Sequence, residues 1–314
     1  MNIRIFIPYF GRFPSYFPFF LKSCGYNPEI EFLIFTDQEL AGELPQNVKI
    51  HNMSFEAFKK MAQSKLALDE HNLKVLTPYK LCDYKPAYGA LFSDYLRDAD
   101  FWGFCDVDLI FGRIFDVLSM EIMQDCDRVL NQGHLTLYRN TPEINHLFEK
   151  KLDKGISFRD AIKVKEPCFF DEIFMPEICR QQRLKQYGEN RFADILPQFG
   201  EFVISPLCSV ANEKGQSFYW ENGRLYQHST HGDHQLMYIH LQKRRLPDET
   251  IPREFSQRIY ITPQGFYTQG QYSEQCNQGD RNQRKMYQKK RLSGLTMRKI
   301  WIKFKVLQME DKLR

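Results

Sequence analysis

Short apolar runs alternate with segments of helical periodicity along the first hundred residues. The runs are too short for helices and suit buried strands, whereas apolar residues between them recur every three or four positions. The pattern predicts strands over 3–7, 31–35, 48–51 and 101–105, and helices over 16–24, from Ser54 onward, and from Lys85 or Pro86 to Leu96. Such alternation is typical of a mainly parallel sheet with helices on both faces. The sequence therefore predicts the α/β class.

After residue 112 the apolar runs are separated by more turns. The pattern predicts helices over 114–123 and from Thr141, strands over 127–130, 135–140, 202–204, 217–220 and 237–241, and mixed loop and helix over 155–200. Thr141 is a suitable N-cap because Pro142 follows at the first helical position. The sequence Glu-Asn-Gly-Arg at 221–224 predicts a hairpin turn. We expect one folded domain over residues 1–263.

The strongest chemical signal is a pair of carboxylates directly after the apolar run 101–105. Asp106 and Asp108 are two positions apart, and alternate residues of an extended chain point to the same side. Both are therefore expected to converge at the carboxyl end of a strand, where open α/β sheets bind ligands. Since the neighbouring residues are apolar, the two charges need a partner, and Mg²⁺ or Mn²⁺ suits paired carboxylates. The alternative is a solvated turn.

Several other classes lack their signatures in this sequence. There is no G-x-G-x-x-G after the first predicted strand and no G-x-x-x-x-G-K-[ST], the main signals of dinucleotide and P-loop sites. The apolar runs fall short of the roughly 18 residues of a membrane-spanning helix, and the N-terminus does not resemble a signal peptide. The eight cysteines show no C-x-x-C spacing, which favours reduced thiols in a cytoplasmic protein.

Positive charge is concentrated at the C-terminus. Residues 281–314 carry twelve Lys or Arg and two acidic residues, whereas the other 280 residues carry 31 basic and 37 acidic ones. Residues 264–284, rich in Gln, Gly, Asn and Arg, predict a linker. Residues 285–314 predict a basic amphipathic helical tail, which suits an anionic membrane surface. The alternatives are a helix that docks on the domain and a partner-binding tail.

Two segments together resemble a known family. Pro78–Gly89 contains Lys-x-x-Asp-x-Lys-Pro, and Phe101–Asp108 ends in Cys-Asp-x-Asp. They resemble a bacterial glycosyltransferase family of GT-A fold, found among enzymes of lipopolysaccharide and capsule biosynthesis and in part still classed as uncharacterised. The similarity covers roughly residues 1–245 and is also strong at 133–140. It implies a GT-A-like, Rossmann-like mixed sheet that binds a UDP-sugar donor, with Mn²⁺ or Mg²⁺ at the Asp pair.

The resemblance implies a nucleotide-binding half over 1–112 and an acceptor half over 113–263. Candidate nucleotide contacts follow the first two strands: Tyr9, Phe10, Gly11, Thr36 and Asp37. Ordinary strand-end turns are the alternative for these five. In the resembling enzymes the second Asp of the motif usually ligates the metal most directly and the first meets the ribose or sugar. This implies Asp108 as metal ligand and Asp106 as a contact of both metal and nucleotide.

Three charged residues before the metal strand also enter through the resemblance. Lys80 and Lys85 are candidates to bind diphosphate as point charges, and Asp83 to accept a hydrogen bond from a sugar hydroxyl. Without the resemblance, these residues would be interpreted as solvated surface charges.

A third metal ligand is expected from a downstream histidine, as in many GT-A enzymes. His240 is the candidate because it lies near the end of the apolar run 237–241. His231 and His234, on a polar loop before it, are rivals. For His240 the alternative is a structural histidine at a strand end, and for the rivals a solvated turn.

A second carboxylate pair, Asp171 and Glu172, follows two phenylalanines. An inverting transferase needs one carboxylate to deprotonate the acceptor hydroxyl, and Asp171 is the first candidate with Glu172 second. The alternative is an acidic pair favoured by a helix dipole. His134 and Arg139 flank a predicted strand and are candidates for the acceptor side, with structural hydrogen bonding as the alternative for His134.

The sequence thus favours a metal-dependent hexosyltransferase acting on a growing surface polysaccharide, with a saccharide acceptor that a lipid carrier could hold. We expect it in the cytoplasm, or peripherally on the inner face of the cytoplasmic membrane. The alternative is a metal-dependent phosphohydrolase or nucleotidyltransferase acting on a nucleotide. A nucleic-acid partner is not expected, because the domain carries more acidic than basic residues.

Overall fold

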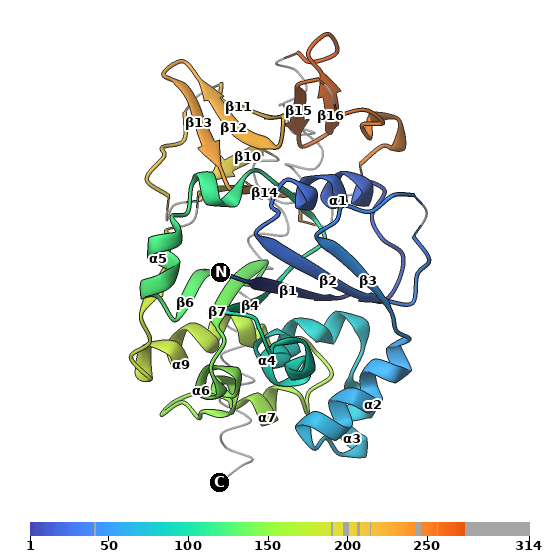
Figure 1. The fold of residues 1–314 in the computed structure, drawn as a ribbon, viewed down its shortest axis with the longest axis vertical. Helices are drawn as coiled ribbons and strands as arrows, with labels where there is room; N and C mark the ends of the chain where they lie inside the picture. The colour runs from blue at the N-terminus through green and yellow to red at the C-terminus, as the bar shows by residue number, and fades with distance from the viewer. Residues whose placement is uncertain are drawn as a thin grey trace, which may run out of the picture.

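The computed structural model describes residues 1–40, 42–189, 191–196, 201–205, 208–213, 215–242, 246–255 and 257–273. Most of the predicted linker and the whole predicted basic tail, 285–314, lie outside the described residues. In the described part, strands and helices build several sheets with helices packed against them (Figure 1). The predicted α/β class is confirmed. None of the described helices is long and apolar enough to cross a lipid bilayer.

A seven-stranded mixed sheet forms the centre of the molecule. Its strands are β1 (Ile3–Pro8), β2 (Ile30–Thr36), β3 (Val48–Asn52), β4 (Phe101–Cys105), β6 (Arg128–Gln132), β7 (Leu135–Arg139) and β8 (Gln186–Tyr187), in the order β3-β2-β1-β4-β7-β6-β8. The strands from β3 to β4 are parallel, β7 is antiparallel to both of its neighbours, and β6 is parallel to β8. The carboxyl ends of β1, β2 and β4 therefore share one edge.

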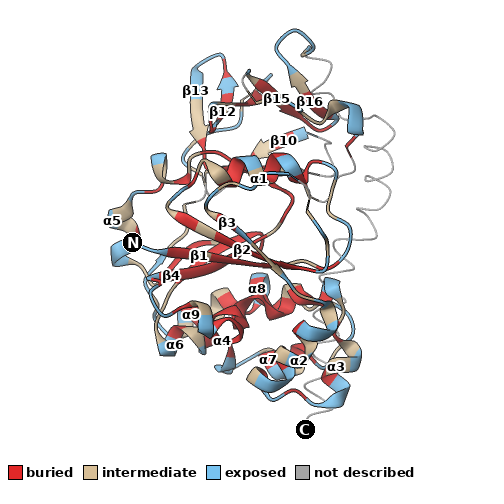
Figure 2. Ribbon diagram, turned by 45° about the vertical axis from the view of Figure 1, so that its right-hand side comes forward, coloured by how far each residue is buried: buried red, intermediate tan, exposed pale blue. Residues whose placement is uncertain are grey.

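The sheet separates two cores, and the helices pack on both of its faces. The helices are α1 (Phe17–Gly25), α2 (Phe55–Leu66), α3 (Glu70–Val75), α4 (Tyr88–Leu91), α5 (Met120–Asp125), α6 (Pro142–Asn145), α7 (Phe158–Ala161), α8 (Phe170–Ile173) and α9 (Met175–Gln181). Ile5 of β1 packs on the side of α1 and the smaller sheets, whereas Phe6 packs on the opposite side with α2, α4 and α6 to α9. Figure 2 shows the buried residues concentrated along these two interfaces.

Two predicted helix starts are confirmed. The Ser54 side chain accepts a hydrogen bond from the Ala57 amide at the start of α2. The Thr141 side chain accepts one from the Ile144 amide, and Pro142 occupies the first turn of α6. Both side chains satisfy amides that have no partner within their helix.

Two other predicted helices are broken into shorter pieces. The range 85–96 consists of the end of a 3₁₀ segment, η1 (Pro78–Ala87), then α4 and a 3₁₀ turn over Ser93–Tyr95. Pro86 lies inside η1, and a proline has no amide to continue α-helical hydrogen bonding. The range 114–123 becomes a 3₁₀ turn and then α5, because Ser119 caps a new helix.

A four-stranded sheet continues directly from the carboxyl end of β4. Its strands are β5 (Leu109–Phe111), β9 (Phe192–Leu196), β10 (Glu201–Ile204) and β14 (Tyr238–His240), in the order β10-β9-β14-β5. β14 is antiparallel to β5 and parallel to β9. Three residues, Asp106 to Asp108, join β4 of the central sheet to β5 of this one. The predicted metal motif is therefore the connection between two sheets.

A five-stranded antiparallel sheet lies beyond α1 (Figure 1). It consists of β11 (Ser217–Glu221), β12 (Arg224–Ser229), β13 (Gly232–Leu236), β15 (Ile259–Thr262) and β16 (Gly265–Thr268). The predicted hairpin turn joins β11 to β12, with positive φ angles of 50° at Asn222 and 81° at Gly223. Strand β16 lies within the predicted linker 264–284, so the folded part extends past residue 263.

Candidate active site

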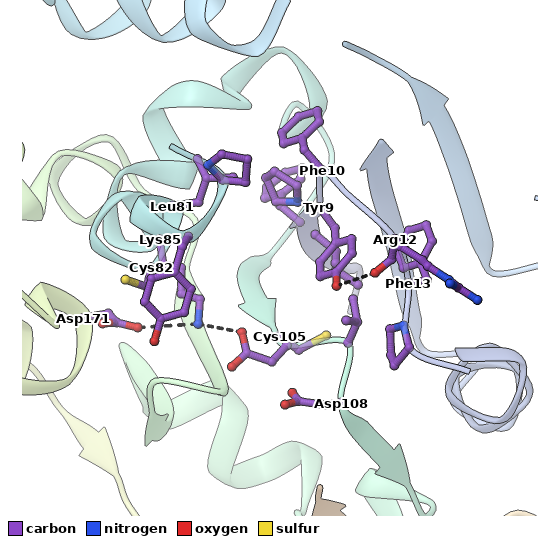
Figure 3. Close-up of a pocket in the computed structure, with 18 of the residues that line it drawn as sticks. Tyr9, Phe10, Arg12, Phe13, Leu81, Cys82, Lys85, Cys105, Asp108 and Asp171 are labelled. Carbon is purple, nitrogen blue, oxygen red and sulfur yellow. Dashed lines mark hydrogen bonds and ion pairs between the residues drawn. The ribbon is translucent and has the colours of Figure 1, made fainter. Parts of the chain in front are cut away.

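A cavity of about 960 Å³ opens at the carboxyl edge of β1 and β4. Its wall is formed by the segment after β1, the 3₁₀ segment η1, the turn between β4 and β5, and the start of α8. Seven of the residues predicted from the sequence line it: Tyr9, Phe10, Lys85, Asp106, Asp108, Asp171 and Glu172. Figure 3 shows Tyr9 and Phe13 on one side of this cavity and Lys85 with Asp171 on the other. The fold thus brings together residues up to 163 positions apart.

Asp106 and Asp108 lie on a tight turn rather than on a continuing strand. The turn is held from both sides, because the Asp106 amide donates to the His134 carbonyl at 3.0 Å and the Leu241 amide donates to the Asp108 carbonyl at 2.8 Å. The Asp106 side chain is 28 % exposed and that of Asp108 only 2 %. The more exposed carboxylate is therefore the first, and the second points into the protein beside β14.

His240, the predicted third ligand, lies next to this pair. It is opposite Leu109 in the β14–β5 pairing, and its Nε2 is 3.6 Å from Asp108 Oδ1. Candidate ligand atoms of Asp106, Asp108 and His240 all lie within 4.8 Å of one another. Burial alone lowers the pKa of His240, but the nearby carboxylates of Asp108 and Asp194 favour its protonated form and raise the pKa to about 10. The position between the carboxylates thus favours a positive charge.

The rival histidines lie on the five-stranded sheet instead. His231 follows β12, with its Nδ1 2.6 Å from a Glu213 carboxylate oxygen, and His234 is in β13. Neither belongs to a described group with metal-ligand geometry.

A second cluster shares His240. His134, Asp194 and His240 also offer ligand atoms within 4.8 Å of one another, and the His134 ring centroid lies 4.3 Å from that of His240. Burial and the charge of His240 hold the pKa of His134 well below its usual value. Asp194 was not anticipated from the sequence. The available signal was an aspartate within the apolar run Phe-Ala-Asp-Ile-Leu at 192–196.

Lys85 links the Asp pair to α8. Its Nζ donates to Asp106 Oδ1 at 2.8 Å and to the Gly133 carbonyl at 2.6 Å, and lies 3.7 Å from Asp171 Oδ2. Burial alone lowers the pKa of this ammonium, but the charges of Asp106 and Asp171 and the hydrogen bond to Asp106 outweigh it and raise the pKa. Lys85 is therefore a fixed positive charge at the cavity wall.

Asp171 and Glu172 occupy the first turn of α8, as the helix-dipole alternative expected, and both also line the cavity. Burial raises the pKa of Asp171 to about 8 despite the opposing charge of Lys85, and burial also raises the pKa of Glu172. Asp171 Oδ1 is buried without a hydrogen-bond partner among the described residues. A Cβ atom at Gly133 would lie 2.3 Å from Glu172 Oε1, so glycine is needed there for Glu172 to pack as it does. The pair thus offers a carboxyl group that can exchange a proton near neutral pH.

Lys80 and Asp83, predicted to contact the donor, lie outside the cavity lining. Both side chains are fully buried, and Lys80 Nζ lies 2.7 Å from Asp83 Oδ2. The two Asp83 oxygens accept hydrogen bonds from the amides of Cys168 at 2.9 Å and Phe170 at 2.8 Å, and Lys80 donates to the Glu166 carbonyl at 2.6 Å. These contacts hold the loop that leads into α8. The contacts of Lys80 and Asp83 thereby fix the backbone directly before Asp171 and Glu172.

The predicted nucleotide contacts divide in a similar way. Tyr9 and Phe10 line the cavity, and the Tyr9 ring stacks on Phe13 at 4.7 Å between centroids. Gly11, Thr36 and Asp37 lie outside the lining. Thr36 is buried and its hydroxyl accepts from the Gln38 amide, while Asp37 accepts from the Gln38 side chain.

Several cavity residues on the segment after β1 were not predicted from the sequence, including Arg12, Phe13, Ser15 and Tyr16. The signal was the aromatic density of the sequence between Tyr9 and Phe20. Arg139, proposed for the acceptor side, instead donates to the carbonyls of Gln124 and Cys126 beside α5.

The fold and the site describe an α/β protein with a carboxylate and imidazole cluster at the rim of a large cavity. Residues 5–270 match a family of unknown function, DUF6625, and the chain belongs to this family. A search of curated proteins finds no match to the chain.

Proposed function

We propose that the protein is a metal-dependent glycosyltransferase that transfers a hexose from a UDP-sugar to a hydroxyl group of a growing surface polysaccharide. The observation that carries the proposal is the convergence of Asp106, Asp108 and His240, whose candidate ligand atoms lie within 4.8 Å of one another. Asp106 and Asp108 also line a cavity of about 960 Å³, a size suited to a small-molecule ligand.

The ligand atoms of Asp106, Asp108 and His240 suit a divalent cation. Two carboxylates and one imidazole suit Mn²⁺, and the carboxylates alone would suit Mg²⁺. Asp108 and Asp194 raise the pKa of His240 because they favour a positive charge beside them, and a bound cation would take the place of the proton on the imidazole. When bound, the ion would neutralise negative charge on the diphosphate of the donor. Asp106, Asp108 and His240 would hold it.

The opposite wall suits the nucleoside. The stacked rings of Tyr9 and Phe13 present an aromatic surface to the cavity, and bases bind aromatic faces by stacking. Lys85 supplies a fixed positive charge nearer to the Asp pair, where it can contact a phosphate or sugar oxygen. A UDP-sugar would therefore lie across the cavity, with its base against the aromatic rings and its diphosphate near Lys85 and the Asp pair.

Asp171 is the proposed general base, with Glu172 as the second candidate. A base works best when its pKa lies near the working pH, and the pKa of Asp171, raised by burial to about 8, meets this condition. Its buried Oδ1, without a described partner, is able to accept the proton of an acceptor hydroxyl.

The acceptor and the location rest on the sequence alone. The resemblance at 78–89 and 101–108 points to lipopolysaccharide, O-antigen or capsule synthesis, and the basic tail at 285–314 to an anionic membrane surface. We therefore propose a cytoplasmic protein that works at the inner face of the cytoplasmic membrane on a lipid-linked saccharide.

Thermal melting with nucleotides tests the donor. UDP with Mn²⁺ should raise the melting temperature more than UDP or Mn²⁺ alone, and more than other nucleotides or DNA. An equal response to every nucleotide would contradict the proposal. Incubation with UDP-hexoses and Mn²⁺ should then release UDP faster when saccharide acceptors are present. Release of phosphate from the nucleotide itself would instead favour the phosphohydrolase alternative.

A further inference from the structure

Three neighbouring strands place side chains of the two overlapping clusters in a row. Asp108 directly precedes β5, His240 ends β14, and Asp194 lies in β9. In the pairing of β14, His240 is opposite Leu109 on one side and Asp194 on the other. The imidazole therefore lies between two carboxylates, only one of which lines the cavity.

The two ring nitrogens of His240 face different carboxylates. Nε2 lies 3.6 Å from Asp108 Oδ1, and Nδ1 lies 3.2 Å from Asp194 Oδ1. A histidine binds a metal through a nitrogen that carries no proton, and the remaining proton then sits on the other nitrogen. In this structure Nδ1 makes no hydrogen bond among the described residues, although Asp194 Oδ1 lies 3.2 Å away. With a metal at Nε2, the proton would remain on Nδ1, where Asp194 is the nearby acceptor.

The Asp194 carboxylate is itself held in place. The side-chain amide of Gln242 donates to both of its oxygens, each at 3.0 Å, and the Ile195 amide donates to Oδ1 at 2.8 Å. Gln242 follows β14 with a positive φ of 49°, a backbone conformation uncommon for residues other than glycine. These contacts fix the carboxylate that faces His240 Nδ1.

The cluster of His134, Asp194 and His240 is the competing metal site. Its carboxylate, Asp194, faces Nδ1 of His240, whereas Asp108 of the predicted site faces Nε2. None of these three residues belongs to the described lining of the cavity, whereas Asp106 and Asp108 do. The cavity side is the one that a substrate can reach.

We propose that Asp194 is a positioning residue that orients His240 for metal binding at the Asp106–Asp108 turn, with Gln242 holding Asp194 in turn. The inference rests on the proposed metal site. Carboxylates that accept from the second nitrogen of a ligating histidine raise metal affinity about 10- to 100-fold. Asp194 thus contributes to the metal without touching it.

Mn²⁺ binding to the full chain without substrate tests the inference, with free Mn²⁺ measured by its EPR signal. Asp194→Ala should weaken binding about 10- to 100-fold, and Asp194→Asn, which keeps an oxygen acceptor, should weaken it less. Gln242→Ala should have a smaller effect in the same direction. His134→Phe should leave Mn²⁺ affinity unchanged.

A matched control lies on the five-stranded sheet, where His228 Nδ1 is 2.5 Å from Asp233 Oδ1. Asp233→Ala removes a carboxylate from a histidine without touching the metal cluster, and it should leave Mn²⁺ affinity unchanged. Pulsed EPR of protein with ¹⁵N-labelled histidine adds a direct readout. Nitrogen coupling to Mn²⁺ should be present in the natural protein, absent in His240→Gln, and reduced in Asp194→Ala.

Two results would overturn the inference. Unchanged Mn²⁺ affinity in a folded Asp194→Ala variant would remove the positioning role. A loss in His134→Phe as large as in Asp194→Ala would assign the ion to the competing cluster. If Mn²⁺ binds as expected but UDP does not, the proposed function fails while the role of Asp194 stands.

Discussion

The 3₁₀ segment η1 contains two lysines, five positions apart, that form ion pairs of very different character. Lys80 and Asp83 are fully buried 2.7 Å apart and hold the loop before α8. Lys85 and Asp106, 2.8 Å apart, lie at the cavity wall, and the Asp106 side chain is 28 % exposed. The first pair has its hydrogen bonds directed at backbone groups, whereas the second faces space that a ligand can enter. Residue type and spacing alone therefore do not distinguish a buried structural ion pair from an ion pair that faces a cavity.

Removing Asp83 should give the largest effect on stability. Asp83→Ala leaves the Lys80 ammonium buried without its carboxylate and two amides without their acceptor, so the free energy of unfolding should fall by about 3–5 kcal/mol. Urea denaturation of the full chain measures it. Asp106→Ala, the matched change at the cavity wall, leaves the Lys85 ammonium beside Asp171 and should cost less, about 1–3 kcal/mol. Equal losses in the two variants would erase the distinction between the pairs.

Removing the proposed metal carboxylate should lower activity and leave the protein folded, the reverse of the result expected for Asp83. Asp108→Asn keeps the size of the side chain but removes one negative ligand, so sugar transfer should fall by about 100- to 1,000-fold. Release of UDP from the donor and circular dichroism are the two measurements. Asp100→Asn, at the opposite end of β4, is the control and should retain activity. A fully active Asp108→Asn variant is incompatible with the metal role.

The rate of sugar transfer should also depend on pH, because Asp171 titrates. Its folded pKa, raised by burial to about 8, means that the proposed base is mostly protonated below that pH. Sugar transfer should therefore rise about tenfold per pH unit below pH 8 and level off above it. Stability should change in the opposite sense. Because the folded state retains this proton while the unfolded state has lost it, this contribution falls from about pH 4 to pH 8.

Asp171→Asn separates this effect from other titrations. The variant should be slow and should lack the rise in rate toward pH 8. If the rise persists in Asp171→Asn, Glu172 or another group is the base.

The smallest expected effect concerns the aromatic wall. Tyr9→Leu keeps an apolar side chain but removes the ring that stacks on Phe13, so UDP affinity should fall about 2- to 10-fold. Isothermal titration with UDP and Mn²⁺ measures it. Tyr226→Leu removes a comparable ring, stacked on Tyr219 in the five-stranded sheet, and should leave UDP affinity unchanged.

The proximity of several residues of the candidate site could be predicted because these residues follow strand ends. The Asp pair after the strand 101–105 and His240 after an apolar run are local features, and the sheets bring them together. Asp194 was missed because its role depends on the register of β9 against β14, which joins residues 46 positions apart. The burial of Lys80 and Asp83 could not be predicted from the sequence. It depends on the packing of the loop at 166–170, which no local pattern encodes.

In the fold, too, local features were predicted and features that depend on distant residues were not. The cap at Ser54 and the hairpin turn at 221–224 depend on neighbouring residues and were predicted correctly. Strand β16 was missed because its four residues, Gly-Phe-Tyr-Thr, are embedded in a polar stretch that contains turn residues. Its pairing with β15 and the packing of Phe266 in the core support it instead.

The turn from Asp106 to Asp108 has no spare length. It leaves the central sheet at Cys105 and enters the four-stranded sheet at Leu109, with both of its ends anchored by strand pairing. One inserted residue would either push Asp108 away from His240 or shift β5 by one position, which would turn its core side chains to the opposite face. The proposed metal binding and the joining of the two sheets therefore depend on the same turn length. A substitution within the turn changes one side chain and leaves the joining of the two sheets intact, whereas a change in the length of the turn would disturb both at once.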